Sequence, residues 1–226
     1  KVKTIDTRKL PEFKEMVFLG GSQEGGDAYI ADAANRKGHL GTYITFKGHD
    51  KTIKSPGLKR RLKDVELEDV TTDVEFANRT LQRDLSKLTD YEYNLLRKNA
   101  YKIRFSDDVY LFDEIASNKS DNYRYEYDTY KDKKGKVKTK KKSIYTGNRN
   151  KILKGDGKWA AQMAIDKGKN VHVYDVAKKG WYTWNSGASR FTRIKEAPKP
   201  GNRITVLGTR SKDSEKRTNA NKAVNS

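Results

Sequence analysis

The sequence predicts an α/β fold in which a mainly parallel sheet lies between helices on both faces, with an inserted basic β-hairpin. The first observation is a short apolar strand at Met16–Leu19, followed by glycines, a small-residue helix over Ala28–Arg36 and a second strand at Leu40–Phe46. That order is typical of a βαβ unit, from which parallel sheets are built. The second observation is that two later helices, over Asp90–Arg104 and Lys158–Lys167, each lead into a short apolar strand.

The later elements continue this alternation. We expect further strands at Val109–Phe112, Val171–Tyr174, Trp181–Trp184 and Arg203–Leu207. Gly168 is the expected end of the second of the two later helices, because glycine readily adopts the left-handed conformation that follows a helix. Helices and strands that alternate in this way favour a three-layer, Rossmann-like architecture.

The chain is expected to form one main domain over residues 16–210, preceded by an N-terminal arm at 1–15 and followed by a polar helix or tail at 211–226. Two insertions interrupt the helix–strand alternation, at 47–89 and 117–152. The first is highly charged and predicts a long polar excursion with one or two short helices. The second contains the hairpin, in which tyrosines alternate with charged residues at a period of two.

The charge balance of the chain points to anionic partners. Its 226 residues include 49 Lys and Arg against 30 Asp and Glu, so the formal net charge is +19. Such an excess favours nucleotides or nucleic acid as partners. No cysteine is present, which excludes disulfides and thiolate catalysis. No apolar run approaches the ~18 residues of a membrane span, so we expect no membrane partner and a cytoplasmic location, and leave a homo-oligomer open.

Three glycine-containing turns predict a phosphate site. They are Gly20-Gly21-Ser22, Gly155-Asp156-Gly157 and Gly208-Thr209-Arg210, and each follows a predicted strand or opens a helix. Glycine lets backbone amides approach an anion closely, and a helix N-terminus adds a partial positive charge. In a parallel sheet such turns meet at the carboxyl edge. The predicted phosphate- or nucleotide-binding residues are Gly20, Gly21, Ser22, Gly25, Gly26, Gly155, Gly157, Lys158, Gly208, Thr209 and Arg210.

The segment FLGGSQEGGDAYIADAANRKG resembles the S-G-G-x-x-G-A-D turn and helix of the SLOG superfamily, with Gly26 where alanine is usual. GDGKWAAQMAIDKGKNVHVYD is similar to that family's second glycine turn, helix and strand, and Trp181–Trp184 resembles a segment of its phage-type members. RITVLGTRS resembles the strand that normally begins a SLOG domain, but here it comes last. The resemblance implies a Rossmann-like nucleotide-binding domain whose first strand unit has moved to the C-terminus. If a phage encodes the protein, the expected location is the host cytoplasm.

Whether the protein is an enzyme stays open. Asp27 and Asp113 are the candidate catalytic residues of a nucleotide hydrolase acting on an N-glycosidic or phosphoester bond, because both lie near predicted strand ends. Such a hydrolase would use Mg²⁺ beside the phosphate, and no cofactor or metal site is otherwise predicted. Asp27 is equally explained as an acid at a helix N-terminus. In LOG-type members a glutamate acts on the N-glycosidic bond, but Ala160 and Ala161 stand near its position here.

The hairpin predicts a second binding surface. Its candidate nucleic-acid-binding residues are Tyr123, Tyr125, Lys138, Lys140, Lys141 and Lys142. Interleaved aromatic and basic side chains suit single-stranded nucleic acid, since bases stack on rings and phosphates meet ammonium groups. The alternative is a solvated hairpin that packs its tyrosines on its own domain or on a partner subunit. Our first functional hypothesis is phosphate binding at the glycine turns, with nucleotide hydrolysis and DNA binding through the hairpin as alternatives.

Overall fold

The computed structural model describes residues 17–21, 33–49, 58–116, 123–131, 135–145, 153–155 and 157–207. Several sequence predictions lie outside these residues. They concern the arm at 1–15, the polar C-terminus at 211–226, and the predicted site residues Ser22, Gly25, Gly26, Asp27, Gly208, Thr209 and Arg210.

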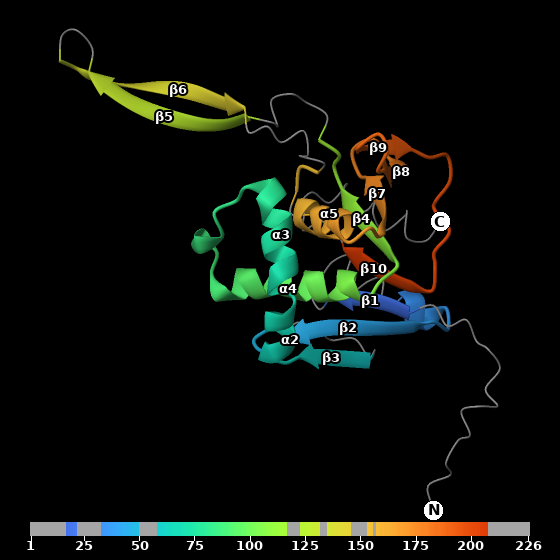
Figure 1. The fold of residues 1–226 in the computed structure, drawn as a ribbon. Helices are drawn as coiled ribbons and strands as arrows, with labels where there is room; N and C mark the ends of the chain where they lie inside the picture. Colours follow the sequence, from blue (N-terminus) through green and yellow to red (C-terminus); the bar gives the residue numbers. More distant parts are fainter. Residues whose placement is uncertain are drawn as a thin grey trace, which may run out of the picture.

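An eight-stranded sheet forms the centre of the fold (Figure 1). Its strand order is β3-β2-β1-β10-β4-β7-β8-β9, and the six strands from β3 to β7 are mutually parallel. The strands β8 and β9 extend one edge as antiparallel neighbours. The strand bounds are β1 (Val17–Gly21), β2 (Leu40–Phe46), β3 (Leu58–Leu62), β4 (Asp108–Asp113), β7 (Asn170–Asp175), β8 (Gly180–Asn185), β9 (Arg190–Arg193) and β10 (Arg203–Leu207). The fold is therefore α/β, as predicted.

Helices cover this sheet as a Rossmann-like, three-layer arrangement. They are α2 (Asp64–Asp69), α3 (Thr71–Leu81), the 3-10 helix η3 (Leu85–Lys87), α4 (Asp90–Arg104) and α5 (Gly157–Asp166). The connection from β1 to β2 runs across the sheet in one direction, and that from β4 to β7 runs in the other. Because such crossovers are right-handed, the helical residues 33–36 of the first connection lie on the opposite face from α5 of the second. No described helix is long and apolar enough to span a membrane.

Side-chain alternation along the central strands divides the core between the two faces. On β4, Val109 and Leu111 belong to the larger cluster, which α3, α4 and α5 cover. Tyr110 and Phe112 point to the other face, where Trp181 packs against both rings at centroid distances of 5.9 and 5.8 Å. A strand that buries both faces reads as a continuous apolar run, which is why Val109–Phe112 was recognisable in the sequence.

The last strand in sequence lies near the middle of the sheet. β10 is inserted between β1 and β4 and runs parallel to both, with Ile204 opposite Phe18 on one side and Asp108 on the other. The chain moves outward from this region in both directions, through β2 and β3 on one side and through β7 on the other. In open parallel sheets the carboxyl ends of strands at such a switch point form a crevice.

Helices are present in the segment at 47–89 as predicted, but the segment is not the polar excursion that we expected. It contributes the strand β3 and the helices α2 and α3, and α3 buries Val74, Ala77 and Leu81 in the main core. β3 has the sequence LKRRL and pairs with β2 alone. An edge strand with charged residues lacks the apolar alternation that a half-buried strand shows, so it was missed, as was β9 with the sequence RFTR.

The predicted hairpin is confirmed. β5 (Tyr123–Lys131) and β6 (Val137–Tyr145) form a separate antiparallel pair, in register from Tyr123 opposite Tyr145 to Lys131 opposite Val137. Gly135 in the turn has φ +75°, a conformation that favours glycine. The hairpin extends away from the sheet and its helices (Figure 1).

Candidate functional site

Two of the predicted glycine turns begin side by side. β1 ends at Gly21 and β10 at Leu207, and the two strands are direct neighbours in which Leu19 lies opposite Thr205. Because the strands are parallel, the chain leaves both of them at the same carboxyl edge and at the same level. This edge lies at the switch point of the sheet, where ligand crevices form in α/β folds.

Two lysines of α4 are buried against this region. Lys98 is 2% exposed and Lys102 is 0% exposed. The Lys102 Nζ donates to the carbonyl oxygen of Val206 at 3.4 Å, one residue before β10 ends. The Lys98 Nζ lies 3.4 Å from the Nε2 of His49, which follows the end of β2 by three residues. Both ammonium groups are therefore directed toward the carboxyl edge of the sheet.

A histidine at the end of β2 links Lys98 to the surface. His49 is buried, and its Nε2 lies 3.4 Å from the Lys98 Nζ while its Nδ1 lies 2.8 Å from the Tyr91 hydroxyl. Its ring stacks on Phe46 at a centroid distance of 4.9 Å. Because Tyr91 is exposed, these three polar groups form a chain from solvent to a buried ammonium group.

In the third glycine turn, the backbone amides donate hydrogen bonds to a carboxylate of the same chain. Asp113, at the end of β4, accepts hydrogen bonds from the backbone nitrogens of Gly155 at 3.2 Å and Gly157 at 3.1 Å. It also accepts one from the nitrogen of Glu114 at 2.7 Å. The amides expected to hold a phosphate thus hold a carboxylate in this structure. A phosphate role for Gly155 and Gly157 stays a prediction, and it would require Asp113 to move away.

The carboxylates of the strand ends have structural partners. Asp113 is buried with three backbone donors, so the structure supplies a reason for this residue other than catalysis. Asp175, at the end of β7, accepts from the nitrogens of Ile115, Ala177 and Lys178. In the part of the chain that the structure describes, no group of three His, Asp or Glu residues could hold a metal ion.

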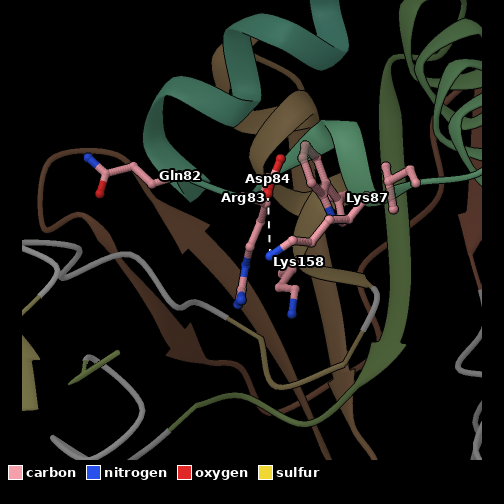
Figure 2. Close-up of a pocket in the computed structure, with 7 residues that line it drawn as sticks. Gln82, Arg83, Asp84, Lys87 and Lys158 are labelled. Atoms are coloured by element: carbon pink, nitrogen blue, oxygen red, sulfur yellow. Dashed lines mark ion pairs between the residues drawn. The ribbon is translucent and has the colours of Figure 1, made fainter. Parts of the chain in front are cut away.

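The predicted residue Lys158 lies in a separate cavity of about 520 Å³ at the start of α5 (Figure 2). The cavity is also lined by Gln82, Arg83, Asp84, Lys87, Leu88 and Trp159. Three cations share it with a single acid, and that acid, Asp84, lies 3.4 Å from the Lys87 Nζ. The indole of Trp159 belongs at the same time to the main core. Lys158 therefore lies in a cavity that α5 shares with the segment after α3.

The predicted nucleic-acid-binding residues lie on the hairpin, which extends away from the sheet and its helices (Figure 1). In its register Tyr123 is opposite Tyr145 and Tyr125 is opposite Ser143. Lys138, Lys140, Lys141 and Lys142 are opposite Tyr130, Asp128, Tyr127 and Glu126. The sequence predictions that fall on described residues thus divide among three places in the fold: the carboxyl edge of the sheet, the cavity at the start of α5, and the hairpin.

Sequence reasoning missed the two buried lysines and His49. The apolar positions Ala100 and Ile103 of α4 are buried, and the helix also buries Leu95, Lys98 and Lys102. The available signal was spacing, since Lys98 and Lys102 follow Leu95 by three and seven residues and so share its side of the helix. A lysine on the inward face of a helix is unusual enough to suggest a role.

Comparison with family models, with curated proteins and with solved structures finds no significant match to this chain. The resemblance to SLOG domains therefore stays a prediction, and the function is argued from the site itself.

Proposed function

We propose that this protein binds phosphate groups of a nucleotide or a nucleic acid at the carboxyl edge of the sheet, where β1 and β10 end. The observation that carries the proposal is the position of Lys102. This side chain is fully buried, and its Nζ lies 3.4 Å from the Val206 carbonyl oxygen, next to the point where the chain enters Gly208-Thr209-Arg210.

Burial makes a lysine an effective anion ligand. Removing an ammonium group from water is costly, and an anion bound beside a buried lysine offsets part of that cost. In a region of low dielectric constant the attraction between an ammonium group and a phosphate is stronger than it is in water. Lys98, one helical turn from Lys102, doubles the positive charge directed at this edge.

The backbone of the same edge is suited to an anion. Gly20 and Gly21 end β1 beside β10, and residues without a side chain let an anion approach the main chain closely. Arg210 follows β10 by three residues, and its guanidinium would match phosphate oxygens with a planar set of donors. Binding without hydrolysis is favoured because the described carboxylate candidate, Asp113, is engaged by backbone amides.

Isothermal titration of the full chain with nucleoside mono-, di- and triphosphates tests the proposal. Lys102→Met keeps the length of the side chain and removes its charge, and we expect at least about tenfold weaker binding, because bonds to charged groups contribute about 1.5–3 kcal/mol. Lys98→Met should weaken binding in the same direction. Lys195→Met is the matched control, since Lys195 is exposed in the connection after β9.

Circular dichroism and thermal melting must show that each variant is folded. Equal affinity of the folded Lys102→Met variant and the wild type would show that the ligand does not use this edge. Absence of binding by any nucleotide or inorganic phosphate to the wild type would also contradict the proposal.

A further inference from the structure

The outer part of the hairpin carries most of the hairpin's positive charge. Residues 123–145 contain nine basic and three acidic residues, a net charge of 9 − 3 = +6. The stretch 129–140 contains six basic residues and one acidic residue, a net charge of 6 − 1 = +5. We call this stretch the hairpin tip.

An exposed aromatic ring lies among these charges. Tyr130 is 48% exposed, and the register places it directly opposite Lys138, which is exposed as well. Lys140 lies two residues further along β6, and therefore on the same face of the hairpin as Lys138. Residues opposite or diagonal to one another across an antiparallel pair are within reach of each other's side chains. The tip thus combines a ring and two ammonium groups on one face.

The hairpin gains little support from the rest of the described structure. Its strands pair with each other and with no strand of the eight-stranded sheet, and the tip also exposes Val137, at 62%. A single two-stranded hairpin is at best marginally stable in water. A partner that covers the tip would therefore stabilise it.

We propose that the hairpin tip binds single-stranded nucleic acid, with Tyr130 stacking on a base and Lys138 and Lys140 contacting phosphates. Charge complementarity favours this occupant, because the tip has a net charge of +5 and a strand of nucleic acid is a regular polyanion. The exposed ring favours a single strand over a duplex, since only unpaired bases are free to stack on an aromatic side chain. A protein partner fits less well, because lysine is depleted in the core of protein interfaces. This surface is additional to the phosphate site at the sheet edge.

Fluorescence anisotropy with the full chain and a labelled oligothymidylate tests this proposal. The oligonucleotide has about 20 nucleotides, so that it is longer than the ~4–16 nucleotides that a typical single-strand site covers. Tyr130→Ala should weaken binding by about fivefold to a hundredfold, which is the usual contribution of one stacked base, whereas Tyr130→Phe should retain it. The pair Lys138→Gln and Lys140→Gln should reduce the slope of log affinity against log salt by up to about 1.4, since each phosphate contact contributes about 0.7. The matched control is Lys195→Gln with Lys199→Gln, two exposed lysines on the connection to β10.

The proposal is overturned if the Tyr130 and lysine variants bind the oligonucleotide as the wild type does, or if the control pair weakens binding equally. It is also overturned if the chain binds vesicles containing phosphatidylserine but not the oligonucleotide. All substituted side chains are exposed, so unchanged melting temperatures are expected. Binding of mononucleotides should be unchanged in the hairpin variants and at least about tenfold weaker in Lys102→Met, so that the two proposals can fail separately.

Discussion

The Oδ2 atom of Asp113 lies 3.1 Å from the backbone nitrogen of Gly157, so a carboxylate at the end of β4 caps the first turn of α5. The other oxygen of Asp113 accepts from the nitrogen of Gly155 at 3.2 Å. A helix N-terminus attracts negative charge and has unpaired amides. Here both needs are met from within the chain, and the contact joins two segments more than forty residues apart in the sequence.

Replacing Asp113 should destabilise the protein. Asp113→Ala leaves the nitrogens of Gly155 and Gly157 without their acceptor, and an unsatisfied buried donor costs about 1–3 kcal/mol. Asp113→Asn keeps one carbonyl oxygen as an acceptor and should cost less. Urea unfolding measures both free energies. If the two variants were as stable as the wild type, the cap would contribute nothing to the fold.

The glycine at the start of α5 is required by the same carboxylate. A Cβ at Gly157 would lie 2.6 Å from the Oδ2 of Asp113 and 3.3 Å from the Cδ1 of Leu153. Gly157→Ala should therefore destabilise the wild type. In the Asp113→Ala background the main obstacle is gone, and alanine has the higher helix propensity. A double-mutant cycle should show that the Gly157→Ala penalty shrinks there, and a penalty of equal size in both backgrounds would contradict this account.

A buried aspartate joins α3, α4 and α5, the three helices that cover the larger core cluster. Asp73 on α3 is 7% exposed and lies 3.0 Å from the Arg104 Nη2 of α4 and 2.7 Å from the Lys167 Nζ at the end of α5. Removing one partner of a buried ion pair costs about 3–5 kcal/mol. We expect Asp73→Ala to lower the free energy of unfolding by about 3 kcal/mol, the lower end of this range, because both cations are partly exposed. Glu68→Ala is the control, since the Glu68 side chain is exposed in its pair with Arg97, and such a pair should contribute at most about 1 kcal/mol. Equal losses would refute the role of this cluster.

The sequence predicted the bounds of helices and strands accurately where apolar patterns or capping residues mark them. The predicted bounds 40–46, 90–104 and 203–207 coincide with β2, α4 and β10. The helix α4 also has a capping box, in which the Thr89 hydroxyl accepts from the nitrogen of Glu92. β3 and β9 were missed because each consists largely of exposed residues, so no burial pattern marks them as strands.

Only one part of the candidate site could be predicted from the sequence, namely the glycine turns that follow apolar strands. The glycines after β1 and β10 follow apolar strands in the sequence, and parallel strands bring such turns to one edge. The burial of Lys98 and Lys102 depends on how α4 packs, because their spacing places them on the side of Leu95 but does not establish that this side faces the sheet. The pairing of Asp113 with Gly155 and Gly157 likewise depends on closure of a loop of about forty residues.

His172 should make the protein less stable in mild acid. It lies on β7 with its ring 4.9 Å from that of Tyr110, and its Nδ1 is buried without a hydrogen-bond partner among the described residues. Burial lowers the pKa of His172 below its usual value, and the nearby charge of Asp108 only partly opposes this. The unfolded chain therefore binds a proton more readily than the folded protein does.

Linkage then sets the direction of the pH dependence. A group whose pKa is lower in the folded state contributes its full stabilisation at a pH above its unfolded-state pKa, which is about 6.5 for histidine. This stabilisation is lost as the pH falls toward the folded-state pKa. We expect the melting temperature to fall between about pH 7 and pH 5. His172→Phe cannot titrate and keeps an aromatic ring beside Tyr110, so its melting temperature should fall less over the same interval. Parallel profiles for the variant and the wild type would show that another group is responsible.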